Sequence, residues 1–305
     1  MRKNVYDNVI SLSSLIFHEK NLQKEKKVRI DGFSTMYPDL DKIIGGLING
    51  DLIVIGGCTS VGKTSFSLSL AVNIASYIKE KKQENESNIY DNKIGSVGFI
   101  SIEMSRQALM FRLIGMISGV SKTRMRCGDL TDDEVKKIQS VYDELILLDL
   151  ILCNPTEIFV SQVIKFSRRM VQNNDLKILF IDYLQLVYCY RRTNDVNRSD
   201  EISLICRSLK GLAKELNIPI VVVSQLNRDV EKRDGKTPII SNLKNSSSIE
   251  QDADTVLFIH RDDISGDTDL VETKILVVKN RNGVRGSAVL YFDRRTCFFV
   301  NNKNI

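Results

Sequence analysis

One segment constrains the fold of this chain more than any other. It reads Gly57-Cys58-Thr59-Ser60-Val61-Gly62-Lys63-Thr64 and satisfies the pattern G-x-x-x-x-G-K-[ST] in full. An apolar run over Asp51–Gly57 predicts a buried strand before it, and a helical pattern over Thr64–Lys79 follows. The glycines let successive backbone N–H groups face phosphate oxygens, and the helix adds its positive end. All eight residues are therefore expected to bind nucleotide phosphates, with Lys63 on the β- and γ-phosphates and Thr64 on Mg²⁺.

Apolar runs alternate with helical patterns along most of the sequence. Further strands are predicted at Ser96–Glu103, Lys177–Asp182, Ile218–Gln225 and Thr255–His260, with helices up to Ser118 and over Thr131–Glu144, Ile158–Asn173 and Glu201–Leu216. This alternation predicts an α/β fold with a mostly parallel central sheet and helices on both faces. Short apolar runs at Thr273–Lys279, Ser287–Phe292 and Cys297–Val300 predict antiparallel strands added at the C-terminal end.

The first 30 residues differ in character from the rest. Apolar residues at 4-3-4 spacing (Val5, Val9, Leu12 and Ile16) predict an amphipathic helix over 4–20. A polar, basic linker follows over Lys20–Arg29, so we expect the main domain to cover residues 31–305. A second polar stretch, Glu80–Asn92, is predicted to form an exposed loop.

Composition limits the cellular compartments and the binding partners that are expected for this chain. The chain has 43 Lys and Arg against 38 Asp and Glu, and this net charge of +5 permits a nucleic-acid partner without demanding one. No apolar run approaches the roughly 20 residues of a membrane helix. The six cysteines form no C-x-x-C pair, and the two histidines have no metal-ligand spacing. We expect a cytoplasmic protein without a membrane partner or a structural zinc site.

Three polar residues stand at the ends of predicted strands. They are Glu103, Asp182 and Gln225. Ligands of parallel α/β sheets bind at the carboxyl ends of the strands, so these side chains are expected beside the phosphate loop. Asp182 would support Mg²⁺, Glu103 would act as the general base on the attacking water, and Gln225 would contact the γ-phosphate. Each alone could be an ordinary polar residue at a strand end, but together they predict ATP hydrolysis.

Several longer motifs then resemble one family. They are GFSTMYPDLDKIIGGL, the phosphate loop, SIEMS (Ser101–Ser105), FIDYLQL (Phe180–Leu186), LAKELNIPIVVVSQLNR (Leu212–Arg228), SIEQDAD (Ser248–Asp254) and KNRNG (Lys279–Gly283). This set is similar to the C-terminal motor domain of DnaB-type replicative DNA helicases, over about Gly32 to Phe299. IDYLQL, SQLNR and SIEQDAD are more specific to that family than to RecA-like ATPases at large.

The resemblance implies a RecA-like P-loop ATPase fold and a homohexameric ring. ATP hydrolysis at the subunit interfaces would drive translocation on single-stranded DNA and unwinding of the duplex in replication. Arg281 matches the arginine finger that reaches the neighbour's nucleotide, and Lys279 matches its companion. From the residues alone, both would be surface charges flanking a turn.

The resemblance also implies two DNA-binding loops. The first covers Tyr188–Asp200 and carries Arg191, Arg192 and Arg198; the second covers Asn242–Ile249 and carries Lys244, Asn245 and Ser247. Such side chains and the backbone N–H groups would hold phosphates without reading bases. For the three arginines, a solvated loop is the alternative.

The sequence departs from the family pattern at four places, one of which is the predicted loop Glu80–Asn92, which looks like an insertion. About 30 residues precede the motor region, so we expect the family's N-terminal domain to be missing. Cys58 and Thr59 replace the arginine and proline of the usual phosphate loop. Lys244 replaces an arginine and Ser247 a glycine in the second DNA loop, which changes a bidentate phosphate contact into a point charge.

These departures leave two functions open. The first is a working helicase motor that binds ATP, Mg²⁺, single-stranded DNA and further copies of itself. The alternative is a truncated, non-unwinding paralogue that binds ATP and regulates or loads a full-length helicase ring. A loader or primase is a further potential partner of either. The presence of Lys63, Thr64, Glu103, Asp182 and Arg281 favours the motor.

Overall fold

The computed structural model describes residues 32–84, 95–189, 197–226, 237–243, 246–261 and 268–302. All of them belong to one compact unit, residues 31–305. The predicted helix over 4–20 and the basic linker lie outside the described residues. The division of the chain at residue 31 therefore stays a prediction.

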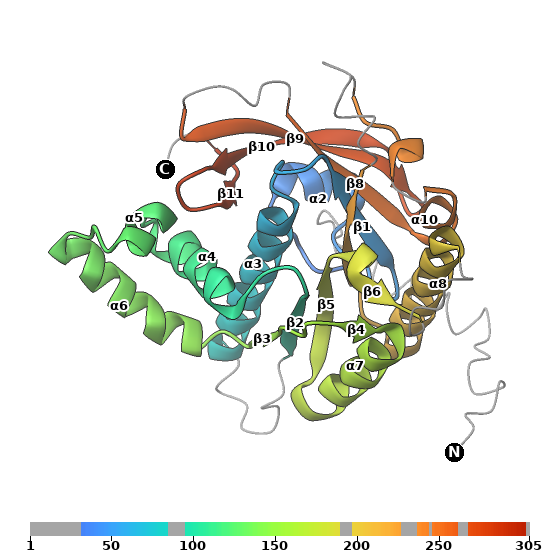
Figure 1. Cartoon of the computed structure of the whole chain (residues 1–305), viewed down its shortest axis with the longest axis horizontal. Helices are drawn as coiled ribbons and strands as arrows, with labels where there is room; N and C mark the ends of the chain where they lie inside the picture. Colours follow the sequence, from blue (N-terminus) through green and yellow to red (C-terminus); the bar gives the residue numbers. More distant parts are fainter. Residues whose placement is uncertain are drawn as a thin grey trace. The chain divides into compact units, whose positions relative to one another are not determined.

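A nine-stranded sheet forms the centre of this unit (Figure 1). Its order is β11-β10-β9-β8-β1-β7-β5-β2-β3. The parallel strands are β1 (Leu52–Gly57), β2 (Ser96–Ser101), β3 (Leu150–Cys153), β5 (Leu176–Asp182), β7 (Ile220–Gln225) and β8 (Thr255–His260), and the antiparallel ones are β9 (Leu270–Asn280), β10 (Gly286–Asp293) and β11 (Phe298–Val300). The predicted α/β class, with a mostly parallel sheet and antiparallel strands at the C-terminal end, is confirmed.

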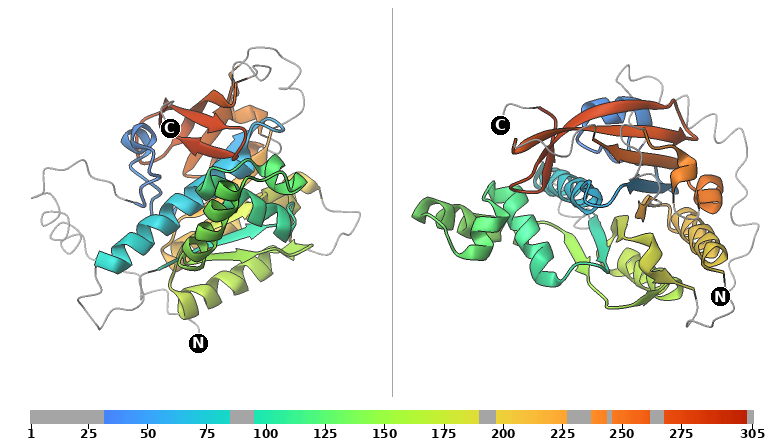
Figure 2. Two further views of the ribbon diagram at one scale, coloured as in Figure 1. Left: turned by 90° about the vertical axis from the view of Figure 1, so that its left-hand side faces the viewer. Right: turned by 45° about the horizontal axis from the view of Figure 1, so that its top comes forward.

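Helices cover both faces of the sheet because its central strands are apolar on both sides. Ile53 and Ile55 pack on one face against α2 (Pro38–Ile44), α3 (Lys63–Glu84) and α4 (Arg106–Ser118). Leu52 and Val54 face the other side, where α7 (Val160–Asn174), α8 (Arg198–Leu216) and α10 (Ser246–Asp252) contribute to the second core. The long β9 and β10 ribbons lie beside α2, and β11 lies against α3 (Figure 2).

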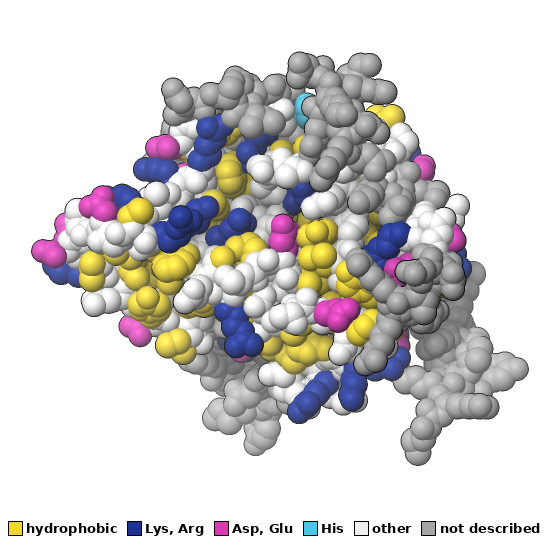
Figure 3. Space-filling view, viewed as in Figure 1, with side chains coloured by type: hydrophobic (Ala, Val, Ile, Leu, Met, Phe, Trp, Pro, Cys, Tyr) yellow, Lys and Arg dark blue, Asp and Glu magenta, His cyan; other side chains and the backbone are white. Residues whose placement is uncertain are grey.

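The remaining elements are short or lie outside the sheet. They are α5 (Lys122–Cys127), α6 (Asp132–Ile146), the strand pair β4 (Ile158–Phe159) and β6 (Val187–Tyr188), and the 3-10 turns η2 (Leu184–Leu186) and η3 (Ile240–Asn242). The predicted capping box of α6 is present, since the Glu134 N–H donates to the Thr131 hydroxyl and the Thr131 N–H donates to the Glu134 carboxylate. Hydrophobic side chains gather over α4 and α6 on the face shown in Figure 3.

The structure corrects three sequence expectations. Residues 80–84 continue α3, so the predicted loop begins later, and its residues from 85 on lie outside the described part. Part of the second expected DNA loop is helical, because α10 starts at Ser246. The edge strand β3 was missed because its four residues are only half-buried and too few to show a period. No described helix combines the length and apolar character that a membrane span requires.

Candidate active site

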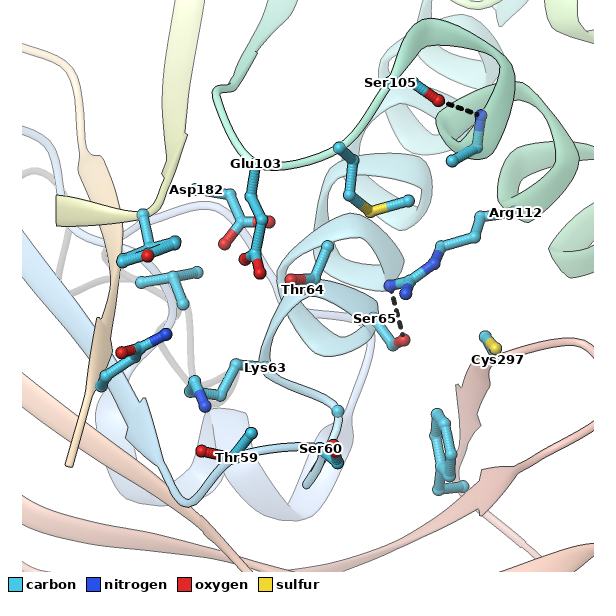
Figure 4. Close-up of a pocket in the computed structure, with 17 residues that line it drawn as sticks. Thr59, Ser60, Lys63, Thr64, Ser65, Glu103, Ser105, Arg112, Asp182 and Cys297 are labelled. Carbon is cyan, nitrogen blue, oxygen red and sulfur yellow. Dashed lines mark hydrogen bonds between the residues drawn. The ribbon is translucent and has the colours of Figure 1, made fainter. Parts of the chain in front are cut away.

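A cavity of about 600 Å³ opens at the carboxyl ends of the parallel strands (Figure 4). Its lining comes from the phosphate loop, from the segments after β2 and β5, from β7, from α4 and from the C-terminal strands. The lining residues are Thr59, Ser60, Gly62, Lys63, Thr64, Ser65, Glu103, Met104, Ser105, Ala108, Arg112, Asp182, Tyr183, Val223, Gln225, Phe292 and Cys297. The three strand-end residues and the loop predicted from sequence therefore share one site.

The phosphate loop connects β1 to α3 and requires glycine at two points, one for its backbone conformation and one for lack of space. Gly62 has φ 98°, in the left-handed region. A Cβ at Gly57 would lie 2.7 Å from Cγ1 of Val61, a buried residue that anchors the loop in the core. Five of the eight predicted residues line the cavity, whereas Gly57, Cys58 and Val61 are not among its lining residues. The Lys63 ammonium donates to the Cys58 carbonyl at 2.6 Å, across the loop.

Two carboxylates point towards Thr64 at the bottom of the cavity (Figure 4). Asp182 ends β5, and a cis peptide bond joins it to Tyr183. Glu103 follows β2, which ends at Ser101 and pairs there with Asp182. Asp182 is buried, whereas Glu103 is exposed to the cavity. A buried acid beside an accessible one is the arrangement expected for a metal support next to a general base.

Burial raises the pKa of Asp182 to about 6. The Thr64 hydroxyl, Arg112 and Lys63 act in the opposite direction, and the Glu103 carboxylate adds to the rise. Neither carboxylate oxygen of Asp182 has a hydrogen-bond partner of ordinary geometry within the described structure. An orphaned buried carboxylate beside a threonine hydroxyl fits Mg²⁺, which prefers oxygen ligands and keeps several waters.

Gln225 reaches the cavity from the last position of β7. Its backbone N–H lies 3.4 Å from Oε1 of Gln185, and the Gln185 amide donates to the Ser224 hydroxyl at 2.9 Å. Gln185 lies in η2, just after the Asp182 strand. The end of β7 is thus tied to the segment that follows Asp182.

Sequence reasoning missed Arg112, which enters the cavity from α4. Its guanidinium donates to the Ser65 hydroxyl at 3.2 Å, directly after Thr64 in the phosphate loop (Figure 4). Ser105, Ala108 and Arg112 recur at a spacing of three and four, so they share one face of α4. That spacing after Glu103 was the signal available in the sequence. Arg112 places a fixed positive charge where phosphate oxygens would lie.

Asn154 was also missed, and it holds the Glu103 segment. Its side-chain amide donates to the Ser101 carbonyl at 2.7 Å and to the Met104 carbonyl at 2.5 Å. These two carbonyls flank Ile102 and Glu103, so one amide fixes the backbone on both sides of the carboxylate. Asn154 directly follows β3, the strand that the sequence did not reveal.

Lys279 and Arg281 do not reach this cavity. Asn280 pairs with Thr255 at the start of β8, whereas the phosphate loop begins level with Ile259. Thr255 and Ile259 are four strand residues apart, which corresponds to about 13 Å along the sheet. Arg281 instead donates to Asp254 at 3.1 Å and to the Gln251 carbonyl, and Lys279 donates to the Glu250 carbonyl. Both cations therefore lie at the amino end of the parallel strands.

The structure describes only some of the predicted DNA-binding residues. Arg191, Arg192, Lys244 and Asn245 lie outside the described residues, and Ser247 is placed only as part of the α10 backbone. Arg198 starts α8 and is already engaged within the chain. Its guanidinium donates to the Gln185 carbonyl at 2.8 Å and the Val187 carbonyl at 2.9 Å, pairs with Glu201 and lies over the Tyr188 ring. These contacts give Arg198 a structural role at the base of the first expected DNA loop.

Comparison with known proteins gives concordant matches. The model of the family "DnaB-like helicase C terminal domain" matches residues 32–301. The chain is 38% identical over 290 residues to a replicative DNA helicase DnaB of Rickettsia prowazekii, covering 88% of this chain and 58% of that protein. It is 36% identical over 275 residues to a probable plasmid replicative DNA helicase of Chlamydia muridarum, covering 90% of this chain and 56% of that protein.

Solved structures agree in fold. A solved ATPase domain superposes with a TM-score of 0.82 at 25% identity, covering 97% of this chain and 100% of that domain. A DnaB-like replicative helicase, solved in a study of its interactions with primase, gives 0.81 at 25% identity over 97% of this chain and 68% of that one. This chain spans somewhat more than half the length of its curated relatives. The match over residues 32–301 confirms the resemblance read from the motifs, and the chain belongs to the DnaB-like helicase C-terminal domain family.

Proposed function

We propose that this chain is an ATP-hydrolysing helicase motor that translocates on single-stranded DNA and unwinds duplex during replication. The carrying observation is the convergence of Lys63, Thr64, Glu103, Asp182 and Gln225 on one cavity. The matched relatives are named replicative DNA helicases, which supports the same function. A complete hydrolytic set also favours the motor over the non-unwinding regulator.

Each side chain of the site has a separate role in the proposed hydrolysis of ATP. The phosphate loop and Lys63 bind the β- and γ-phosphates, and Gln225 contacts the γ-phosphate. Glu103 accepts a proton from the attacking water as its oxygen bonds to the γ-phosphorus and the bond to the β-phosphate oxygen breaks, giving ADP and phosphate. Thr64, with Asp182 acting through water, would hold Mg²⁺, which neutralises phosphate charge when bound.

The position of Arg281 supports a ring. In this chain it lies at the end of the sheet opposite to its own cavity, which supports a role at the nucleotide of an adjoining copy rather than at its own. A fixed positive charge delivered across an interface stabilises the transition state of phosphoryl transfer. We therefore propose a homohexamer with ATP and Mg²⁺ bound between subunits, acting in the cytoplasm, with primase or a loader as further partners.

The test is DNA-coupled ATP hydrolysis. The purified chain is assayed for ATPase rate with and without single-stranded DNA and for strand displacement from a forked duplex, with Lys63→Ala as the inactive control. Stimulation by DNA together with strand displacement is the expected result. Nucleotide binding with a rate no higher than that of Lys63→Ala would contradict the motor and favour the regulator.

Arg112→Ala is expected to weaken nucleotide binding by about tenfold or more, because a charge-assisted hydrogen bond to phosphate is lost. The guanidinium enters the cavity beside Ser65, next to the phosphate loop. Titration calorimetry with a non-hydrolysable ATP analogue and Mg²⁺ measures the change. Arg106→Ala is the matched control, because Arg106 is exposed on the same helix and does not line the cavity. Equal affinities for both variants would refute the assignment.

Asn154→Asp is expected to lower kcat by about tenfold or more, because misplacing a catalytic group by a fraction of an ångström is costly. The aspartate keeps the shape but cannot donate to the Ser101 and Met104 carbonyls that flank Glu103. Steady-state kinetics should show the loss in kcat, with nucleotide affinity close to that of the wild type. A normal kcat in a variant of normal thermal stability would show that Glu103 needs no such support.

A further inference from the structure

Asp254 is a buried carboxylate at the amino end of β8. Its side chain is only 5% exposed. Oδ2 accepts from the Leu52 N–H at 2.8 Å and from the Lys210 ammonium, while Oδ1 accepts from the Arg281 guanidinium at 3.1 Å. The Asp254 carbonyl also accepts from the Arg281 N–H at 3.0 Å. Arg281 is thus held at both its backbone and its side chain by one residue.

Neighbouring groups add further hydrogen bonds to this arrangement. Lys210 reaches from α8 and also donates to the Gly50 carbonyl at 2.8 Å and to Asp51 at 3.2 Å. Asp51 in turn accepts from the side chain of Asn282, the residue after Arg281, at 2.7 Å. Burial raises the pKa of Asp51, and the Asp254 charge adds to the rise. The turn that carries Arg281 is therefore fixed to the start of β1 and β8.

The second support of the two cations is the C-terminal end of α10. Lys279 donates to the Glu250 carbonyl and Arg281 to the Gln251 carbonyl, two consecutive acceptors of that short helix. Burial lowers the pKa of Lys279, and the Arg281 charge adds to this effect. The helix carbonyls and Asp254 together offset the repulsion between the two cations.

The neighbouring charges indicate what the contact between Asp254 and Arg281 contributes to each of the two residues. Lys210 and the Leu52 N–H both contact Oδ2 of Asp254, and the largely buried Lys210 supplies the opposite charge, whereas Arg281 contacts Oδ1. The Arg281 side chain is 46% exposed, so the pair with Asp254 contributes little to folding after solvent screening. Its main consequence is to restrict the guanidinium to one orientation at the edge of the sheet.

We propose that Asp254 is a positioning residue for Arg281, which it orients towards the nucleotide of an adjoining copy. This inference rests on the proposed function, because it assumes that Arg281 acts across a subunit interface. It assigns a role in hydrolysis to a residue that lies five strand residues, about 17 Å, from the level at which the phosphate loop of its own chain begins. An interaction across an interface has a signature that a purely structural residue lacks, which is recovery of activity in mixed rings.

The test uses co-expressed, differently tagged chains. Asp254→Asn alone should lower kcat about tenfold with little change in the KM for ATP, because one arm of the Arg281 contact weakens. Co-assembly with Glu103→Gln, which has an inactive cavity but an intact Arg281, should raise the rate per Asp254→Asn chain. Arg281→Ala with Glu103→Gln is the reference pair. Asp149→Asn removes a carboxylate that pairs with Lys82 elsewhere and should keep the wild-type rate.

Each outcome decides the question. Recovery in both mixed assemblies supports the role of Asp254. Recovery in the reference pair alone, or a normal rate for Asp254→Asn, overturns it while leaving the proposed function in place. Absence of recovery in the reference pair contradicts the action of Arg281 across the interface, and the inference falls with it. Should Asp254→Asn fail to bind nucleotide, Asp254→Glu keeps the charge for Lys210, displaces it by one methylene, and takes the same test.

Discussion

Arg281→Ala is expected to lower the ATPase rate of the assembled ring by about 10³- to 10⁵-fold, the range measured for loss of an arginine finger. The physical reason is that the guanidinium neutralises charge that develops on the transferring phosphoryl group, while contributing less to the ground state. The measurement is the steady-state rate with saturating single-stranded DNA, together with the affinity for a non-hydrolysable analogue, which should change little.

The matched control for this variant is Arg285→Ala. Arg285 is exposed in the same turn between β9 and β10, and it is not among the residues that line the cavity. Its replacement should leave the rate near the wild-type value. A fall of similar size in both variants would indicate damage to the turn rather than loss of a specific charge. A wild-type rate for Arg281→Ala would exclude the role across the interface.

Glu103→Gln is expected to lower kcat by about 10²- to 10⁴-fold, the usual contribution of a general base. Glutamine fills the same space and still accepts a hydrogen bond, but it cannot take a proton from water. Nucleotide affinity should stay close to that of the wild type, because phosphate binding depends on the loop and on Lys63. Single-turnover hydrolysis of labelled ATP separates the chemical step from product release.

Glu144→Gln serves as the control for the charge change, since Glu144 is exposed on α6 and lies outside the cavity. A Glu103→Gln rate within a few-fold of the control would mean that another group activates the water. Asp182 would then be the next carboxylate to test, because it lies beside Glu103 and its buried oxygens lack a hydrogen-bond partner of ordinary geometry within the described residues.

Contiguous or periodic features were predictable from the sequence. The phosphate loop consists of eight consecutive residues, so its motif can be recognised within one short segment. Glu103, Asp182 and Gln225 could be found because each follows an apolar run, and parallel strands bring their carboxyl ends to one edge. All three line the cavity, and the α/β architecture agrees with the predicted one. Strand and helix ends shifted by a few residues, as for β2, which ends at Ser101 rather than Glu103.

Residues that act through contacts distant in the sequence were not predictable. Arg112 reaches Ser65 from 47 residues away, and Asn154 reaches Ser101 from 53 residues away. Asp254 contacts Leu52 across 202 residues. The helical spacing of Ser105, Ala108 and Arg112 marks a shared face of α4 but does not reveal Ser65 as the partner. A side chain acquires such a partner only when the sheet order brings the two segments together.

The sequence by itself determined the phosphate loop, the three strand-end residues and the layered class of the fold, because these depend on local backbone chemistry and on hydrophobic period. The tertiary structure decided at which end of the sheet Lys279 and Arg281 lie. Arg281 follows an antiparallel strand and so lies at the end opposite to the cavity. That placement arises from the direction in which β9 pairs with β8, and strand direction is set by packing across the whole sheet rather than by any single segment.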